Sequence, residues 1–528
     1  MREDVEHRRI VLPLLAFALL VTVLALTHDV WRDEVRAFSV ATHPETWGAM
    51  LGALHEEGHP ALWYVVLRTG YLLTGSPYVM QVVAAVMGVA TAWVILRFAP
   101  FTPPVRLLAV FGAFLTYELT VVARNYGIGV LLILVACSLF ETRHDRPWRL
   151  AIVLALAANT SVHAAVATGL ITALWIVDLT RSSVTRRAIL QVVVPVLVVL
   201  VAIAFAFATA AAPPEMAYSF ALSSITPESI TGAILIDPGH SLRGTSEASL
   251  VASGEIPWER LGLDTTIVSR VLVNVAIGFV AWGLRRNKLH LAAFIVAVLA
   301  FELIFRIVYP GALRHQALLA FLIFGICWLA VVTTNPSDRR AAARRVSVGL
   351  LPLLAIQTAA LPFTAARHIR KPESMAEALA DAVRSEPRVA KAVLMSEPDA
   401  LMETLPFYVD NPVYFPRQRE FDFRTYFDRG ERRQKNLSLG ELTGIADSVS
   451  CVTGQPVLLS IGHRAFHFTD SGRYEGPYGS VFTWSPPEYA AFVARYKPLR
   501  WFRGATSDEN YRTYVAAPPV TCRDRTSR

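Results

Sequence analysis

The chain has 528 residues, of which 54% are hydrophobic and only 17% are charged, and its formal net charge is +8. A soluble protein of this size carries more charge because its surface faces water. The composition therefore excludes an ordinary soluble enzyme and predicts a polytopic α-helical membrane protein. No basic run with interleaved aromatic residues is present, so nucleic acid is not an expected partner.

Repeated apolar segments, each about as long as a membrane-crossing helix, predict about eleven transmembrane helices. The first is interpreted as an uncleaved span rather than a signal peptide, because it lacks a small-x-small site and many spans follow it. The expected spans are 10–27, 78–97, 105–123, 126–141, 149–163, 164–180, 188–211, 267–284, 289–308, 315–333 and 346–365.

Every second connection between these spans is rich in arginine, as the positive-inside rule requires of cytoplasmic loops. With Arg8 and Arg9 in the cytoplasm, the odd number of spans places the C-terminus outside. We expect a bacterial inner (plasma) membrane, although the layout would also suit the endoplasmic reticulum. The other arginine-rich connections contain Arg97 and Arg106; Arg143, Arg146 and Arg149; Arg181, Arg186 and Arg187; Arg285, Arg286 and Lys288; and Arg339, Arg340, Arg344 and Arg345.

Two domains are expected. Residues 1–365 form the transmembrane domain, with long outer loops at 28–77 and 212–266, and residues 366–528 form an extracytoplasmic α/β domain. In the second domain, 389–409 predicts strand, turn, helix and strand, 455–466 a buried strand, and 485–496 a capped helix. In the first outer loop, an apolar segment with Trp63, Tyr64 and Tyr71 predicts a helix lying at the level of the lipid headgroups.

Cys451 and Cys522 both fall in the second domain. In an oxidising compartment they would form a disulfide. Two buried free thiols are nearly as good an interpretation, because the sequence does not place the two residues within bonding distance.

The first outer loop opens with "WRDEVRAF", which puts Asp33 and Glu34 at the mouth of the first span. Other polar residues fall at the same depth, near the outer ends of later spans, and together they predict a polar cavity open to the outside. They are Glu118, Arg124, Asn125, Tyr126, His163, Glu302, Arg306, Arg314 and His315.

Each residue also has a structural interpretation. Glu302 and Arg306, at i and i+4, have the spacing of an ion pair on one helix face. His163 can be a packed core histidine, and Asp33 can be a helix cap. As a group they suit another role. Arginines at headgroup depth would clamp a lipid phosphate, and a neighbouring carboxylate would take a proton from an incoming hydroxyl.

Three motifs resemble those of the C-type (GT-C) membrane glycosyltransferases, especially the protein O-mannosyltransferase and lipid A aminoarabinose transferase branch. They are "WRDEVRAF", "EGHPALWYVVL" and "VVARNYGIGVLLILVACSLF". The resemblance implies that Asp33 is the catalytic base and that Glu34 orients it or contacts the acceptor. It also implies that Arg124 lies near the donor phosphate and that His59 lies on a loop shaping the site.

The reaction implied is transfer of a sugar, with inversion, from a polyprenyl-phosphate donor to an extracytoplasmic glycan, lipid or protein. Arg314 and His315 are assigned to the donor phosphate by position and chemistry. The chain lacks the carboxylate that many relatives carry after the arginine of "RNYGIG", and it lacks an Asp-x-Asp pair in the first loop. No cofactor is therefore expected, and dependence on a divalent metal stays open.

Three other functions fit parts of the pattern. A transporter or flippase of a lipid-linked or anionic substrate also needs charged groups among its spans, but would more often place them at the midplane. A non-catalytic assembly protein would leave the acids and arginines without a role. A polysaccharide polymerase or ligase shares the lipid-phosphate donor. The expected partners are the lipid-linked donor, membrane lipids and an extracytoplasmic acceptor.

Overall fold

The computed structural model divides the chain into two compact units. The helical unit contains Met1–Thr27, Glu57–Ala211 and Phe220–Ile369, and the second unit contains His28–Glu56 and Arg370–Arg528. The start of the expected outer loop 28–77 therefore clusters with the C-terminal residues. The structure describes residues 2–181, 186–211, 226–231, 240–244, 264–307, 311–426, 432–462, 470–476, 479–517 and 522, so most of the expected loop 212–266 lies outside the described residues.

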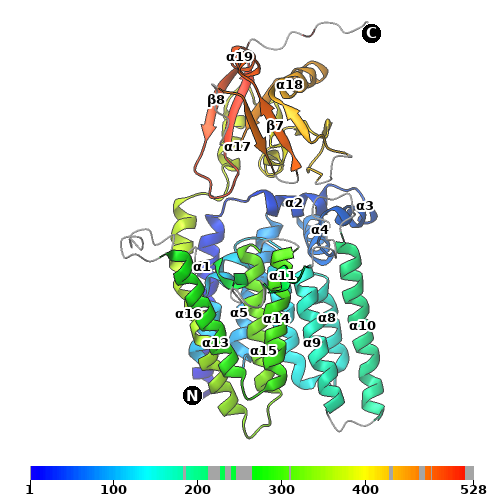
Figure 1. Ribbon diagram of the computed structural model, residues 1–528, viewed down its shortest axis with the longest axis vertical. Helices are drawn as coiled ribbons and strands as arrows, with labels where there is room; N and C mark the ends of the chain where they lie inside the picture. The colour runs from blue at the N-terminus through cyan, green and yellow to red at the C-terminus, as the bar shows by residue number, and fades with distance from the viewer. Residues whose placement is uncertain are drawn as a thin grey trace. The chain divides into compact units, whose positions relative to one another are not determined.

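The helical unit is a bundle of long helices that run alongside one another (Figure 1). Among the described residues, eight helices are long and apolar enough to cross a membrane, which confirms the prediction of a polytopic helical protein. These are α1 (Arg2–Leu26), α5 (Val79–Phe98), α9 (Val162–Arg181), α10 (Arg186–Ala210), α13 (Thr265–Leu284), α14 (Lys288–Ile307), α15 (Leu313–Val332) and α16 (Arg339–Arg370). Two further apolar helices, α7 (Tyr126–Leu139) and α8 (Pro147–Ala158), are shorter.

Three of the arginine-rich connections meet at one end of this bundle. Arg339, where α16 begins, donates to the Glu141 carboxylate after α7 at 2.6 Å. Arg143 in the same connection donates to Asp178, near the end of α9, at 2.7 Å. These contacts place the three connections at the same end of the folded bundle.

The expected span 105–123 is not a continuous helix. α6 (Pro103–Val110) ends after two turns and is followed by a π-helical turn, η2 (Phe114–Glu118). Backbone groups released by such a break need new partners inside an apolar bundle, and threonine hydroxyls can supply them. The Thr120 hydroxyl, for example, donates to the Leu115 carbonyl oxygen at 2.6 Å. Hydropathy alone does not reveal this break because the segment stays apolar throughout.

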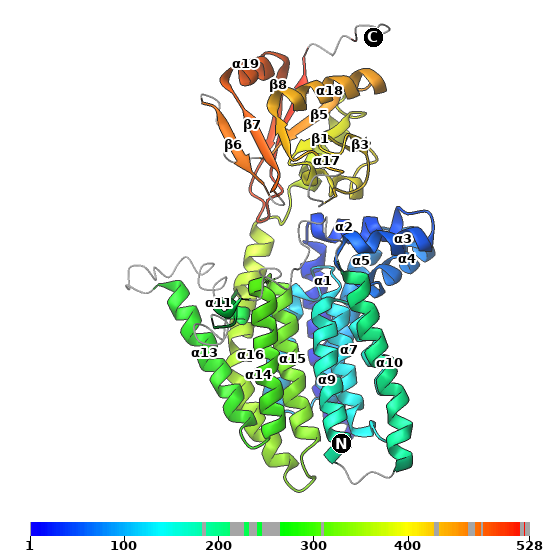
Figure 2. The ribbon, with the colours of Figure 1, turned by 45° about the vertical axis from the view of Figure 1, so that its right-hand side comes forward.

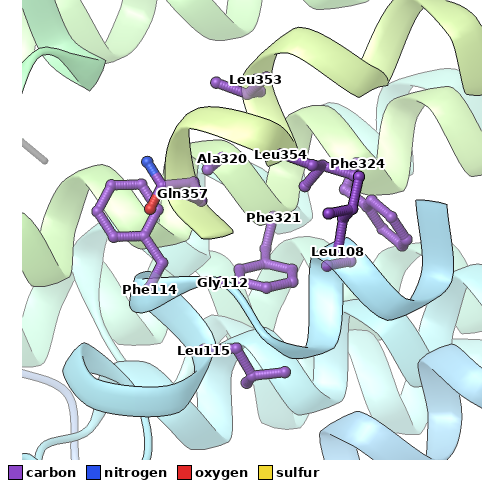
Figure 3. A pocket seen from close by; sticks show the side chains of 11 residues that line it. Leu108, Gly112, Phe114, Leu115, Ala320, Phe321, Phe324, Leu353, Leu354 and Gln357 are labelled. Carbon is purple, nitrogen blue, oxygen red and sulfur yellow. The ribbon is translucent and has the colours of Figure 1, made fainter. Parts of the chain in front are cut away.

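Beside the break, α6, α15 and α16 enclose a cavity of about 10 Å³ (Figure 3). Its lining is apolar apart from Gln357, and side chains such as Phe114, Phe321 and Leu354 surround it. A space of this volume holds about one water molecule. It is therefore a packing defect of the core and too small for a substrate.

The aromatic segment of the first outer loop forms α4 (Leu62–Thr74). Trp63 and Tyr64 are 1% and 2% exposed, so the expectation that they contact lipid headgroups is wrong. Tyr71 on the same helix is half-buried. The aromatic face of α4 packs into the protein, where burial of two large rings is worth several kcal/mol, on the order of 2–3 each.

The second unit is an α/β domain around a mixed four-stranded sheet of order β1-β5-β9-β8 (Figure 2). β1 and β5 are parallel, and the other neighbours are antiparallel. Its strands are β1 (Val393–Glu397), β2 (Tyr414–Phe415), β3 (Glu420–Phe421), β4 (Asn436–Ser438), β5 (Val457–Ile461), β6 (Gly472–Glu475), β7 (Val481–Trp484), β8 (Tyr496–Phe502) and β9 (Tyr511–Ala516). Its helices are α2 (Arg32–Thr42), α3 (Trp47–Ala53), α17 (Ala376–Ser385), α18 (Leu439–Thr453) and α19 (Pro486–Arg495).

Both faces of the four-stranded sheet are buried. Successive strand residues point to opposite faces, so Leu394 joins the core beneath α17 whereas Val393 and Met395 join the core beneath α18 and α19. This explains why β1 and β5 are continuous apolar runs rather than alternating ones. The prediction of a C-terminal α/β domain is confirmed.

The local predictions in this unit have mixed outcomes. The buried strand within 455–466 and the helix within 485–496 are confirmed as β5 and α19. In 389–409, β1 is present, but two short 3₁₀ turns replace the expected helix and no strand follows within the segment. Cys451 and Cys522, whose pairing the sequence leaves open, form a disulfide.

Candidate active site

Three helices of the helical unit begin at one place. α7 starts at Tyr126, α9 at Val162 and α15 at Leu313, and these helices pack against one another. The first N–H groups of a helix lack intrahelical partners, and the helix dipole leaves partial positive charge there. Three such ends together favour an anion, and phosphate is a common one.

Tyr126 and His315 join the first turns of α7 and α15. The Tyr126 hydroxyl lies 2.7 Å from Nε2 of His315, and Nδ1 of His315 accepts the backbone N–H of Ala312 at 2.9 Å. Because Nδ1 accepts, the neutral ring carries its proton on Nε2 and donates it to the Tyr126 oxygen. The Tyr126 O–H proton is therefore directed to a different acceptor.

His163, in the first turn of α9, packs against the same pair. Its ring centroid is 4.8 Å from that of His315 and 6.2 Å from that of Tyr126. The side chain is buried, and neither ring nitrogen has a hydrogen-bond partner among the described residues. Since buried polar groups are normally satisfied, His163 is suited to bind a ligand.

Arg124, Arg314 and His59 surround this group. All three lie close enough to His315 to interact with it electrostatically, and the His59 ring meets Tyr126 edge-on at 6.3 Å. The structure thus brings together six of the predicted substrate-binding residues, namely His59, Arg124, Tyr126, His163, Arg314 and His315.

Two other predicted residues are buried nearby. Asn125 is 2% exposed, and its amide donates to the Thr160 carbonyl oxygen at 2.7 Å, which ties the start of α7 to the segment before α9. Glu118 is the last residue of η2 and is also buried. The Asn125 contact gives that residue a positioning role.

Glu302 and Arg306 form the ion pair that their spacing allows, with 3.5 Å between Arg306 Nε and Glu302 Oε2. The other carboxylate oxygen of Glu302 accepts the backbone N–H of Ser241 at 2.5 Å. Glu302 is fully buried and therefore fixes the segment His240–Leu242 onto α14.

The backbone of the arginine-bearing segment is held by close packing at Gly127. A Cβ atom at this position would lie 2.3 Å from the Leu119 carbonyl oxygen. Only glycine lets the chain after η2 pass this close to the first turn of α7. Gly127 therefore helps to place Arg124 and Tyr126.

The acid pair lies on α2, in the second unit. Asp33 is half-buried in the first turn, where the helix dipole stabilises a carboxylate. Glu34 is fully buried, and its carboxylate lies 2.8 Å from Nε2 of His28. Burial lowers the pKa of His28, but the Glu34 carboxylate outweighs it, so the net shift of that pKa is upward. Of the two acids, Asp33 is the more accessible.

The C-terminal residues of the same unit hold α2 through charged contacts. Both terminal nitrogens of Arg32 bind the Asp508 carboxylate, at 3.1 and 3.2 Å, and its backbone N–H donates to Glu509 at 3.0 Å. Arg36 donates to Glu403 at 2.8 Å. Arg36 and Glu403 are both buried, so α2 is anchored on either side of Asp33.

Arg32 and Arg36 are not among the site residues predicted from the sequence. They lie one residue before and three residues after Asp33, in the very motif "WRDEVRAF". Two arginines in one short helix that also carries apolar residues indicate that the arginines become partly buried and need acidic partners. Their acidic partners are more than 360 residues away in the chain, so no local pattern identifies them.

Within the described part of the chain, no group of three or more His, Cys, Asp or Glu side chains is arranged to hold a metal ion. The described residues define a helical, membrane-type protein with an anion-favouring group of side chains in the helical unit and a carboxylate-bearing helix in the second unit.

No protein-family model matches the chain, and no curated protein matches it. Among solved structures, the chain is similar to ArnT from Cupriavidus metallidurans in its apo state. The identity is 14% over 96% of this chain and 97% of that one, with a TM-score of 0.47.

Proposed function

We propose that the protein is an inverting glycosyltransferase that moves a sugar from a polyprenyl-phosphate donor to an extracytoplasmic acceptor. The observation that carries the proposal is the meeting of three helix N-termini with Arg124 and Arg314 inside an apolar bundle. Such a site favours a phosphate, and the apolar surface around it favours a phosphate attached to a lipid.

Each residue of this group has a proposed part. Arg124 and Arg314 bind the donor phosphate and stabilise the charge that grows on it as the sugar leaves. Tyr126 donates its O–H to a phosphate oxygen, because His315 already donates to the tyrosine oxygen. His163 and His59 contact the sugar or the phosphate.

Asp33 is the proposed base. It takes the proton of the acceptor hydroxyl while that oxygen attacks the anomeric carbon, and the bond from this carbon to the phosphate oxygen breaks. Polyprenyl phosphate leaves with the bonding electrons, so a single displacement inverts the anomeric carbon. Glu34, paired with His28, orients the first turn of α2 rather than reacting.

The proposed location is a bacterial inner membrane, with the N-terminus cytoplasmic and the second unit extracytoplasmic. The arginine-rich end of the bundle supports this orientation through the positive-inside rule. The disulfide between Cys451 and Cys522 supports an oxidising compartment for the second unit.

The test is sugar transfer by the full chain in lipid nanodiscs. A panel of radiolabelled polyprenyl-phosphate sugars is offered with a crude membrane and cell-wall acceptor fraction, with and without EDTA. Asp33→Asn should abolish transfer of the active sugar, and Arg124→Ala should lower kcat by about 10²–10³-fold. Glu45→Gln, an exposed carboxylate in the same outer segment, serves as the matched control.

The outcomes separate the proposed roles. Transfer that survives Asp33→Asn would remove Asp33 as the base. A product that retains the donor's anomeric configuration would contradict a single displacement. Absence of transfer across the panel, from protein shown to be folded, would favour transport of the lipid-linked substrate instead.

A further inference from the structure

The second unit contains an open cavity of about 520 Å³, apart from the groups described above. Its wall is formed by His43 at the end of α2, by residues between 406 and 413, and by β3 with the residues after it. Its volume is that of a pocket for a small molecule or for a few units of a polymer. The lining residues are His43, Pro406, Val409, Asp410, Asn411, Pro412, Val413, Phe421, Asp422 and Phe423.

Aromatic rings form one side of the cavity. His43 and Phe423 are stacked, with centroids 4.7 Å apart and planes 15° apart. Phe421 is 49% exposed and rests edge-on against Tyr414 at 5.0 Å. A half-exposed aromatic ring that is held in place by a neighbouring ring can stack against the C–H face of a sugar, because the ring face is electron-rich.

Carboxylates form the polar part. Asp410 is exposed and makes no hydrogen bond or ion pair with any described residue. Asp422 is held in place, because one of its oxygens accepts the Phe423 N–H at 2.6 Å and the other accepts the Tyr426 hydroxyl at 3.0 Å. Each carboxylate oxygen accepts more than one hydrogen bond, so both side chains can still receive hydroxyl or ammonium donors.

The described residues that line the cavity include no lysine or arginine. Two carboxylates that face no lysine or arginine among the described lining residues repel phosphate, sulfate and uronic acids. The lining therefore selects against anionic ligands, the class that suits the Arg124 and Arg314 group of the helical unit.

The walls are also preformed. The Asn411 amide donates to the Ala392 carbonyl oxygen at 2.8 Å, and the Gln418 side chain accepts the Tyr426 N–H at 2.7 Å. These contacts fix the two segments that carry Asp410 and Asp422. A ligand that enters does not have to order them, which lowers the entropic cost of binding.

We propose that this cavity binds a non-anionic carbohydrate, one whose units bear hydroxyl or amino groups, by stacking on Phe421 and by hydrogen bonding to Asp410 and Asp422. If the proposed transferase activity holds, the bound carbohydrate is the acceptor glycan. The binding itself does not depend on that activity.

The test is saturation-transfer difference NMR on the full chain in nanodiscs, followed by titration of each sugar that binds. The probes are chito-oligosaccharides, their de-N-acetylated forms, neutral hexose oligosaccharides and oligogalacturonate. Phe421→Ala should weaken binding about fivefold or more, as loss of one aromatic contact implies. Asp410→Asn should weaken it about tenfold, as loss of a charge-assisted hydrogen bond implies.

Matched controls are available in the same unit. Trp501→Ala removes a ring of similar exposure (51%) that is not in the lining, and Glu420→Gln removes an exposed carboxylate next to Phe421 that is also not in the lining. Neither control should change the affinity.

Three results would overturn the proposal: no saturation transfer to any non-anionic sugar, preference for oligogalacturonate, or equal losses in the lining and control variants. Binding is measured separately from transfer, so a chain that binds sugar but transfers none fails the proposed function alone. A chain that transfers sugar without using the cavity fails this inference alone.

Discussion

Arg36 and Glu403 are a buried ion pair that joins α2 to the C-terminal residues. Removing one partner of such a pair leaves an uncompensated buried charge, which costs about 3–5 kcal/mol. We expect Arg36→Ala to destabilise the second unit by about that amount. Hydrogen–deuterium exchange of peptides from 28–56 should then rise strongly in the full chain.

The control for this variant is Arg384→Ala. Arg384 pairs with Asp381 at the surface, and both side chains are more than half exposed. Exposed pairs contribute about 0–1 kcal/mol. Equal exchange in the two variants would show that the Arg36 pair does not anchor α2.

Glu509 makes the stability of the second unit depend on pH. Burial raises the pKa of Glu509 from 4.5 to about 7, against the opposing effect of Arg32 and of hydrogen bonds. Between these values the folded state holds a proton that the unfolded state has lost, so stability falls as the pH rises from about 4.5 to about 7. The shift corresponds to about 3 kcal/mol.

Glu509→Gln should remove most of this fall in stability between pH 4.5 and 7, and thermal unfolding at a series of pH values measures it. Glu475→Gln, at an exposed site, should keep the pH dependence of the unaltered chain. His28 acts in the same direction, since the stability from its raised pKa is present below pH 6.5 and is lost at higher pH. A variant as pH-dependent as the unaltered chain would contradict the role given to Glu509.

At the scale of single residues, the sequence identified the groups that share one end of the bundle. Arg124, Tyr126, His163 and His315 were found because their depth along the spans follows from hydropathy. Which of these side chains hydrogen-bond, and that Glu34 is buried against His28, were not predictable. Such contacts depend on the angles at which helices pack, and helix packing angles leave no local pattern in the sequence.

Among the elements, the connection from η2 to α7 leaves no space for a side chain at residue 127. Gly127→Ala would place a methyl group against the Leu119 carbonyl oxygen and push the segment carrying Arg124 and Tyr126 away. A displacement of about 1 Å at a reacting site can cost about 10²-fold in rate. We expect a loss of that order in sugar transfer.

Gly169→Ala in α9 is the matched control, since nothing lies within 4 Å of a Cβ atom there. Alanine is also the better helix former, by about 1 kcal/mol. The control should keep full activity and equal or higher thermal stability. Loss of activity in both variants would point to a general effect of substitution in the bundle.

Long, strongly apolar helices were predicted well because a membrane span needs about 20 apolar residues and little else. The predictions for residues 105–123 and for the aromatic face of α4 were wrong. The first segment has the composition of a membrane span, and the second has that of an interfacial helix. Their shape depends on tertiary packing, which composition does not encode.

For the whole molecule, the orientation across the membrane can be tested with single introduced cysteines. Cys137 and Cys327 are buried, and the other two are joined in a disulfide, so the unaltered chain offers no reactive thiol. We expect Glu475→Cys to react with a membrane-impermeant maleimide added to intact cells.

Ser337→Cys, in the exposed connection before α16, should react only after the cells are opened. Both sites are exposed in the folded chain, so a difference in labelling reports the side of the membrane rather than burial. The reverse pattern would invert the proposed topology.

The interleaving of the two units has a consequence for biosynthesis. Arg36 leaves the ribosome 367 residues before its partner Glu403, a delay of about 20–70 s at common rates of translation. Throughout that interval α2 has none of the C-terminal carboxylates that later neutralise its arginines. The nascent chain therefore completes most of its bundle before the helix bearing Asp33 acquires its final support, and a product truncated before residue 403 carries the acid without the scaffold that orients it.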